Sequence, residues 1–469
     1  MSIIQFIKTK LKRIENSQKK FPTDQIKSYY QSRDITDTRF LCHAPFNNMY
    51  FNSVGDVANC WLTFDDPEKY SEQRTIKDIW FGAKFNTLRE NIKKFDLSSR
   101  CSTCLNYINN GNHTNALAKA YDNEYPLSDY PTMMEFELTN TCNLECTMCT
   151  GLLSSSIRAN REKLPKLKSP YGSKFVSELE EFIPYLHEAR FNGGEPFLIR
   201  IYYDIWERII RINPKCKIVV ATNGTILTDK VKNILGRGNF HLNISIDSLI
   251  EERYSEIRVN GDLKKVLENF IFFKDYCHSN KRSLCVMINP MKNNWEEMPA
   301  FVNFCNNHNV HLWFNTIVHP EDLSLWRLSS DELNQIFQLL KGASFDKGET
   351  SNSLFVYNTR TYYNLVNNQI KQWLEDSMSR VEIENDQENY RDNFLHKVEV
   401  YCKEKNTVKE YEIFLRNWNE FETIVGDNNE MDFVFSYLLK MPVDQYFKII
   451  INETPEFLFD KYKSLKTMS

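Results

Sequence analysis

Three cysteines at positions 142, 146 and 149 lie close together, spaced C-x3-C-x2-C after a short β-like run at residues 134–138. A four-iron, four-sulfur cluster bound by four cysteines has no open coordination position, whereas one bound by three leaves one iron free to take another ligand. A structural zinc site needs four protein ligands, and no Cys or His near these residues supplies the fourth. Three core cysteines are the alternative, but core cysteines do not usually crowd within so short a stretch. The spacing therefore favours a cluster-binding loop.

A second group of cysteines lies on the N-terminal side of this loop. Cys42 and Cys60 are spaced C-x17-C around an expected hairpin at residues 49–57, and Cys101 and Cys104 are spaced C-x2-C after an expected helix at residues 75–94. Four thiolates can close the coordination of a metal site completely, and they suit both zinc and iron–sulfur clusters. Residue chemistry alone leaves both metals open.

From residue 131 the pattern changes to a repeated alternation of strands and helices, which predicts a parallel α/β architecture. The expected strands are 133–138, 189–192, 218–222, 242–246, 284–288 and 310–314. The expected helices are 174–186, 201–212, 228–235, 263–276 and 299–307. Six such units predict a partial (β/α)6 barrel, whose functional loops lie at the carboxyl ends of the strands.

Small polar and flexible residues follow three of these strands at the same edge of the sheet. Two glycines allow a backbone to approach a ligand closely, and a glutamate can accept a hydrogen bond from an ammonium group. Short polar side chains at the next two strand ends could bind a ribose. Each motif alone is ordinary. The residues are Gly193, Gly194 and Glu195 after the second strand, Thr222 and Asn223 at the third, and Ser245 at the fourth.

The three-cysteine loop followed by these strand ends, in this order, resembles the radical SAM superfamily over residues 131–320. The resemblance implies that Cys142, Cys146 and Cys149 bind a 4Fe-4S cluster whose open iron binds the amino and carboxylate groups of S-adenosylmethionine. It also implies cofactor contacts: Met148 near the adenine, Gly193, Gly194 and Glu195 at the methionine amino end, Thr222, Asn223 and Ser245 on the ribose side, and Arg258, which matches an arginine often found after the fourth strand.

The chemistry that this resemblance implies is reductive cleavage of S-adenosylmethionine to a 5′-deoxyadenosyl radical, which abstracts a hydrogen atom from a substrate carbon. A reductase or a flavodoxin- or ferredoxin-type donor would supply the electron. The protein would position the substrate and exclude competing reactions. Glu135 and Glu137, in the first strand, and His319 are candidate groups of the barrel interior, although a structural salt bridge explains the two glutamates at least as well. No catalytic acid or base is identified.

The N-terminal cysteines, with Gly55 between the first pair, resemble the twitch or SPASM modules that hold auxiliary iron–sulfur clusters. This resemblance favours a second, auxiliary 4Fe-4S cluster at Cys42, Cys60, Cys101 and Cys104 over zinc. In familiar members the module follows the barrel, whereas here it precedes it. The expected domains are an N-terminal helical and polar segment at 1–39, the auxiliary-cluster module at 40–115, the barrel at 131–320 and a mainly helical C-terminal extension at 321–469.

Composition restricts the partners and the compartment. The net charge of −4 does not favour nucleic acid as a partner, and no apolar run has the length of a membrane span. Twelve cysteines without a secretory signal predict a reducing cytoplasm. The expected substrate is a peptide or protein modified at carbon. A small-molecule dehydrogenase and a non-catalytic electron carrier or sensor are the alternatives.

Overall fold

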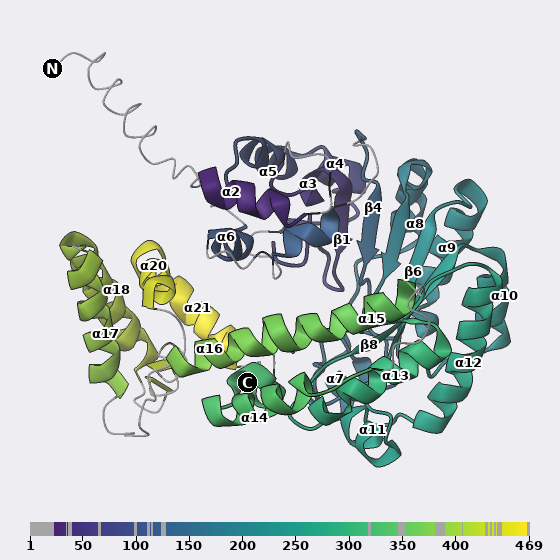
Figure 1. Ribbon diagram of the computed structural model, residues 1–469. Coiled ribbons are helices and arrows are strands. Elements are labelled where there is room, and N and C mark those ends of the chain that lie inside the picture. Colours follow the sequence, from purple (N-terminus) through teal and green to yellow (C-terminus); the bar gives the residue numbers. More distant parts are fainter. Residues whose placement is uncertain are drawn as a thin grey trace. The chain divides into compact units, whose positions relative to one another are not determined.

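The structure is a computed structural model that describes most of the chain (Figure 1). The described residues are 23–33, 35, 40–63, 67–97, 101–109, 113, 116–122, 128–317, 320–345, 353–379, 390–405, 407–426, 430–431, 434–435, 438 and 443–466. The first 22 residues of the predicted segment 1–39 and the candidate residue His319 therefore lie outside the described part.

Nine strands form one sheet in the order β3-β2-β1-β4-β5-β6-β7-β8-β9. Strands β4 to β9 are all parallel, and each pairs with the next strand along the chain. Their bounds are Met133–Phe136, Glu188–Phe191, Lys217–Thr222, Phe240–Ser245, Leu284–Ile288 and His311–Phe314. The six predicted strands are thus confirmed, and they form a partial (β/α)6 barrel that stays open because β9 does not pair with β4.

The parallel strands alternate between two different faces. In β6, β7 and β8 every second residue is buried, and the residues between are only partly buried. The buried face carries Ile218, Val220, Leu242, Ile244 and Val286 and packs against helices in one large hydrophobic core. The opposite face, here called the inner face, carries polar residues such as Asn243 and Ser245. This alternation follows from the two-residue period of a strand.

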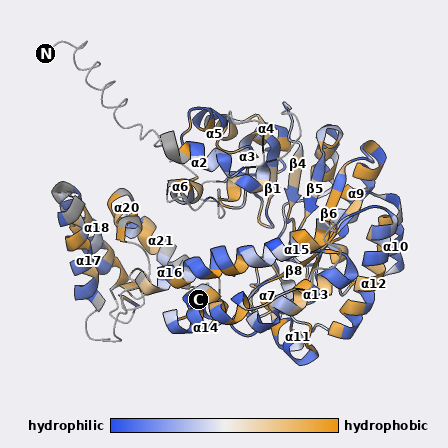
Figure 2. Ribbon diagram, in the orientation of Figure 1, coloured by the Kyte–Doolittle hydropathy of each residue, from blue (hydrophilic) through white to orange (hydrophobic). Residues whose placement is uncertain are grey.

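Helices cover the buried face of the sheet (Figure 1). They are α8 (Ser173–Glu178), α9 (Arg200–Ile212), α10 (Asp229–Arg237), α11 (Glu251–Ile257), α12 (Leu263–Ser279) and α13 (Met298–His308), with the short α7 (Ser155–Asn160) beyond β4. Figure 2 shows that they carry both hydrophobic and hydrophilic residues, as amphipathic helices do. The expected helix 174–186 ends early, because α8 gives way to 3-10 turns at Leu179–Glu181 and Ile183–Tyr185.

The N-terminal module continues the same sheet. Its hairpin, β1 (Asn48–Phe51) and β2 (Asp56–Ala58), is the one expected from the sequence, and β3 (Glu68–Lys69) pairs with β2. Strand β1 runs parallel to β4, with Asn48 opposite Met133 and Phe51 opposite Phe136. The module is therefore joined to the barrel by backbone hydrogen bonds.

Short helices complete this module. They are α2 (Thr23–Gln31), α3 (Ala44–Asn47), α4 (Ile76–Trp80), α5 (Ala83–Lys93) and α6 (Ser102–Asn109), with a 3-10 turn η2 at Leu117–Tyr121. The expected helix 75–94 is divided into α4 and α5 at Phe81 and Gly82, where Gly82 has the extended backbone of a helix N-cap. A second hydrophobic core, which includes Tyr29, Leu41, Ile92 and Tyr121, fills the module.

Beyond the barrel the chain is helical, as predicted. Helix α14 (Ser330–Lys341) begins with a capping box between Ser329 and Glu332. Helix α15 (Ser353–Asn364) continues through a π-helical turn, η9 (Leu365–Ile370), into α16 (Lys371–Ser379). Asn358 of α15 is fully buried; its amide nitrogen donates to Val310 O at 2.9 Å, and its oxygen accepts from Leu312 N at 2.8 Å. This residue fixes α15 along the edge of β9.

The chain divides into two compact units, Met1–Ser377 and Met378–Ser469. Helices α14 and α15 of the predicted extension thus belong to the unit that holds the barrel. The second unit contains α17 (Tyr390–Lys405), α18 (Val408–Val425), α20 (Val443–Asn452) and α21 (Pro455–Lys466), packed on aromatic residues such as Phe394, Phe414 and Trp418. Within the described residues, no helix has the length and apolar character needed to cross a bilayer.

We expect Asn358→Ala to lower the free energy of unfolding by about 2–4 kcal/mol, because it leaves buried backbone groups of β9 without partners. Urea unfolding measures this. Asn367→Ala is the matched control, since Asn367 lies exposed in the same helical run and the change in helix propensity is similar. Equal effects of the two substitutions would contradict the role given to Asn358.

Candidate functional site

The three-thiol loop, residues 142–149, contains no helix or strand of its own. Its backbone is held from outside: Glu145 N donates to Val259 O at 3.0 Å, and Thr147 N donates to Ile257 O at 2.9 Å. The Ser154 hydroxyl donates to Leu144 O at 2.7 Å. The loop is therefore pinned to the segment that ends α11 and to the start of α7. All three thiols remain partly accessible.

The glycine turn after β5 lies directly against this loop. Glu195 N donates to Thr141 O at 2.7 Å, and a Cβ on Gly194 would come within 2.2 Å of that same oxygen. Gly193 and Gly194 both have positive φ angles, of 76° and 41°. A Cβ on Gly193 would meet the side chain of Glu137 at 2.4 Å. Both glycines are thus required by a left-handed backbone and a close approach.

Glu195 is fully buried, and its oxygens accept three hydrogen bonds from the chain. The donors are Thr222 Oγ1 at 2.8 Å, Phe197 N at 3.1 Å and Asn223 N at 2.7 Å. Burial raises the pKa of this carboxyl to about 7, and the three hydrogen bonds oppose that shift. In this structure Glu195 and Thr222 join the ends of β5 and β6. Their direct contact with a ligand stays a prediction.

Asn223 links the end of β6 to the thiol loop. Its amide nitrogen donates to Asn143 Oδ1 at 3.0 Å and lies 4.0 Å from the Cys142 sulfur. Its oxygen accepts from the backbone nitrogen and the hydroxyl of Thr225. Asn223 therefore orients the thiol loop. Its predicted place on the ribose side of a cofactor stays a prediction.

Arg258 is buried between the thiol loop and β7. It forms a salt bridge with Asp247, with Nη2 to Oδ2 at 2.6 Å, and its Nη1 lies 4.0 Å from the Cys146 sulfur. Asp247 is fully buried and also accepts from the backbone and side-chain nitrogens of Asn289. A guanidinium beside a sulfur favours the negative charge of a thiolate ligand. The sequence analysis missed Asp247; the signal that could have found it is an acidic residue two positions after Ser245, just past the end of β7.

Among the predicted cofactor contacts, Met148 and Ser245 remain partly accessible, as do the two glycines of the turn after β5. Met148 packs against a small apolar cluster of Ile257, Met291 and Ile317, which gives an apolar bed beside the thiol loop. Ser245 ends β7 on the inner face. The structure therefore brings every motif residue to one edge of the sheet.

The two glutamates of β4 differ in their surroundings. Glu135 is fully buried and accepts from Asn48 Nδ2 at 2.7 Å and Tyr121 Oη at 3.0 Å, with Arg190 Nη1 at 3.5 Å. It is a structural link between module and barrel. Glu137 is partly accessible, and among the described residues no cation lies within ion-pair distance of it. Its hydrogen-bond partner is the Tyr50 hydroxyl.

The four N-terminal cysteines line one small cavity, together with Asn59, Thr63 and Tyr121. Cys42 precedes α3, which leads into β1, Cys60 follows β2, and Cys101 and Cys104 lie at the start of α6. In the described part of the chain, no three Cys, His, Asp or Glu side chains converge on a point as ligands of a single ion do. The four cysteines instead line one shared space, and their binding of a common group stays a prediction.

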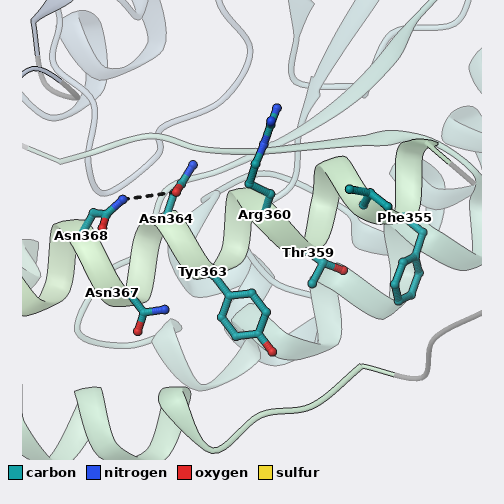
Figure 3. A pocket seen from close by; sticks show the side chains of 8 residues that line it. Phe355, Thr359, Arg360, Tyr363, Asn364, Asn367 and Asn368 are labelled. Atoms are coloured by element: carbon teal, nitrogen blue, oxygen red, sulfur yellow. Dashed lines mark hydrogen bonds between the residues drawn. The ribbon is translucent and has the colours of Figure 1, made fainter. Parts of the chain in front are cut away.

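A separate hollow lies along α15 and η9 (Figure 3). Figure 3 shows Phe355 and Tyr363 pointing to one side of the helix, while Arg360 and Asn364 point to the other. Asn368 Nδ2 donates to Asn364 Oδ1 at 3.2 Å. None of the motif residues lines this hollow, and all of its lining residues come from one helical run. It is therefore distinct from the thiol site.

Comparison with known proteins finds two family matches. Residues 136–305 match the radical SAM superfamily, and residues 42–105 match an iron–sulfur cluster-binding domain, SPASM. The cluster-binding domain thus precedes the barrel, as the cysteine pattern indicated.

Among curated proteins, the GTP 3′,8-cyclase of Limosilactobacillus fermentum is 28% identical over 235 residues, which span 49% of this chain and 67% of that protein. The GTP 3′,8-cyclase of Lactiplantibacillus plantarum is 26% identical over 48% of this chain and 65% of its own length. The chain therefore spans about two thirds of the length of these relatives.

Two solved structures illustrate the structural matches. Native anSMEcpe with bound AdoMet is 17% identical, has a TM-score of 0.36, and is matched over 45% of this chain and 59% of its own. Streptococcus suis SuiB bound to S-adenosylmethionine is 15% identical, has a TM-score of 0.34, and is matched over 55% and 58%. The chain spans less than two thirds of either. Because both TM-scores are low, the fold is assigned from the sheet topology of this chain and not from these matches.

We expect Gly194→Ala to displace the glycine turn from the thiol loop, because its Cβ would clash with Thr141 O. Iron per protein after anaerobic reconstitution should fall by about half, since the N-terminal thiols are untouched. Gly236→Ala in α10 is the control: nothing lies within 4 Å of its Cβ, and alanine favours the helix by about 0.5–1 kcal/mol. Unchanged iron content in Gly194→Ala would contradict this account of the turn.

Burial raises the pKa of Glu137 to about 7 from 4.5, the Tyr50 hydrogen bond opposes the shift, and Glu135 adds to it. Tyr171 and Tyr202 are the other titratable groups that face it. Because the folded state favours the protonated carboxyl, this residue lowers stability as pH rises from about 4.5 through 7. We expect Glu137→Gln to gain stability relative to wild type between pH 5 and 8, by about 2 kcal/mol.

Urea unfolding of both proteins at pH 5, 6.5 and 8 measures this difference. Glu268→Gln, at an exposed position of α12, is the control and should show no pH-dependent gain. A Glu137→Gln curve parallel to wild type would show that the carboxyl titrates normally.

Proposed function

The chain is a radical SAM superfamily protein with an iron–sulfur cluster-binding domain on the N-terminal side of its barrel, and from this premise we propose that it uses S-adenosylmethionine to abstract hydrogen from a substrate carbon. The observation that carries the proposal is the convergence of four segments at one sheet edge. These are the thiol loop, the glycine turn, the end of β6 and the Asp247–Arg258 pair.

The residues at this edge fit a three-thiolate cluster. Cys142, Cys146 and Cys149 would hold it, because their loop is fixed by neighbouring backbone while the thiols stay accessible. Asn223 Nδ2 and Arg258 Nη1 each lie 4.0 Å from a ligand sulfur. When bound, such a cluster would supply the electron for reductive cleavage of S-adenosylmethionine, the chemistry needed for hydrogen abstraction from a substrate carbon.

Residues of this chain would position the cofactor and the substrate. Met148, on its apolar bed, suits an adenine face, and Ser245 suits a ribose hydroxyl. Glu195, Thr222 and Asn223 hold the strand ends in place. Glu137, without a cation beside it, is available on the inner face to a hydrogen-bond donor.

The four N-terminal thiols would hold the auxiliary 4Fe-4S cluster. Support comes from the cavity that all four line and from the match to an iron–sulfur cluster-binding domain. The cavity adjoins the barrel through Tyr121, which lines it and also donates to Glu135 of β4. A low-potential donor, such as a flavodoxin or ferredoxin, would reduce the catalytic cluster.

The substrate that we propose is a peptide or protein, modified at carbon. Support is the long helical region after the barrel, with the aromatic and amide side chains of α15 and η9 on its surface (Figure 3). A small molecule is the second candidate, because the curated relatives are named GTP 3′,8-cyclases. We place the protein in the cytoplasm, where its cysteines stay reduced.

We expect wild type, reduced with dithionite under anaerobic conditions, to convert S-adenosylmethionine to 5′-deoxyadenosine. The variant with Cys142, Cys146 and Cys149 all changed to alanine should lose this cleavage and keep roughly half of the iron, because the N-terminal site remains. Chromatography of 5′-deoxyadenosine, with an iron and sulfide count, measures both. The complementary variant, with the four N-terminal cysteines changed to alanine, should lose the other half of the iron.

Cleavage that persists in the triple variant would overturn the proposed function. The substrate classes separate in the same assay. A deuterated peptide encoded by a neighbouring gene and deuterated GTP are added in parallel, and deuterium should enter 5′-deoxyadenosine from the peptide. Transfer from GTP alone would replace the peptide with the small-molecule candidate.

A further inference from the structure

We infer that the basic segment at residues 158–168 is the docking surface for an acidic protein that delivers electrons to the thiol loop. This inference rests on the proposed function, since the catalytic cluster must receive its electron from outside the chain. It assigns the electron donor a place on the molecule.

The charge of this segment departs from that of the whole chain. Residues 158–168 contain five cations and one carboxylate, whereas the chain has a net charge of −4. From residue 146 to 170 the only acidic residue is Glu162, and its Oε1 accepts from Gly151 N at 2.6 Å. The carboxylate of Glu162 is thus engaged in a hydrogen bond with the backbone. The cations are Arg158, Arg161, Lys163, Lys166 and Lys168.

The segment is attached to the thiol loop by direct contacts. Arg161 Nη1 donates to Cys146 O at 3.2 Å and to Glu145 O at 3.3 Å. Asn160 Nδ2 donates to Glu145 Oε1 at 2.7 Å. Lys163 has a positive φ of 55°, which turns the chain within the segment. The positive charge is therefore held beside a ligand residue.

Exposed apolar side chains flank the cations. Leu152, Leu153 and Leu164 are 42%, 39% and 46% exposed, and Lys166 and Lys168 are exposed as well. Protein interfaces commonly combine apolar contact with complementary charge, and charge complementarity accelerates encounter. A partner with an acidic face and an apolar centre fits this surface.

An electron donor fits this place better than an acidic peptide substrate does. A substrate must bring its carbon into contact with the cofactor at the inner face of the barrel. A donor needs only to approach the cluster, because one electron leaves the reduced donor and enters the oxidised cluster through the intervening atoms. The segment contacts the backbone of Glu145 and Cys146, on the ligand loop itself.

The test measures binding of flavodoxin to the reconstituted protein by titration calorimetry at low salt. In the double variant Lys166→Glu, Lys168→Glu we expect the dissociation constant to rise at least tenfold. The control is Lys215→Glu, Lys281→Glu, two exposed lysines in the loops that precede β6 and β8, at the opposite ends of the strands from the thiol loop. The control should bind within twofold of wild type.

Added salt should weaken wild-type binding and affect the double variant much less, because screening removes the same charge attraction. The neutral variant Lys166→Gln, Lys168→Gln should lose an intermediate amount of affinity for flavodoxin. It replaces the charge-reversed variant if that variant does not fold. Cleavage of S-adenosylmethionine with reduced flavodoxin should slow in the double variant, while cleavage with dithionite stays unchanged. The dithionite reaction tests the proposed function separately.

Equal binding by wild type and the double variant would overturn the inference, as would no binding of flavodoxin to wild type or an equal loss in the control. A double variant that binds flavodoxin normally but shows reduced deuterium transfer from an acidic peptide, with dithionite as reductant, would assign the segment to the substrate instead.

Discussion

The thiol loop contains no helix or strand, so its backbone must be held by neighbouring segments. Most of these segments lie at the carboxyl ends of the barrel strands. Cys149 N donates to Cys146 O at 3.1 Å within the loop, but other backbone groups of the loop take partners from outside it, since buried backbone groups without partners are costly. The partners come from Ile257 at the end of α11, from Val259 just after it, and from Ser154 before α7, while Glu195 N holds Thr141, the residue that precedes the loop. Segments more than a hundred residues apart in sequence therefore share one small volume.

Parallel strands make this sharing possible. Because β4 to β9 run in the same direction, each strand delivers its following loop to the same edge. The buried face supplies the stability through aromatic residues such as Phe191 and Trp206, and the inner face is left free for polar groups. The same alternation explains why Glu137 and Ser245 lie on the accessible side while Phe136 and Ile244 are buried.

Much of this arrangement could be predicted from the sequence. All six parallel strands and the N-terminal hairpin follow from apolar runs bounded by turn residues, and the capping box at Ser329 follows from its own four residues. The division of residues 75–94 into two helices and the early end of α8 were not predicted, because the apolar spacing continues through both breaks. Local patterns locate elements better than their ends.

Contacts between residues far apart in the chain could not be predicted from the sequence. Nothing in the hairpin sequence indicates that β1 pairs with β4. Nothing near Glu195 indicates that its carboxylate accepts hydrogen bonds from Thr222 and Asn223. The pairing of Asp247 with Arg258 and the attachment of Arg161 to the thiol loop are of the same kind. The boundaries of the four predicted domains stay predictions. The motifs identify the chemistry, whereas the substrate depends on side chains whose neighbours only the fold reveals.

The parallel pairing of β1 with β4 has a consequence for biogenesis. During synthesis β1, β2 and the two-residue β3 emerge long before β4, and strands this few and short are only marginally stable in water. The open edge of β1 exposes unpaired backbone groups until β4 arrives. Cys60, which follows β2, and Cys42, which precedes the helix before β1, cannot hold their final positions earlier. Maturation of the N-terminal metal site is thereby coupled to the folding of the barrel's first strand. A chain whose synthesis stops before β4 can complete neither the metal site nor the sheet.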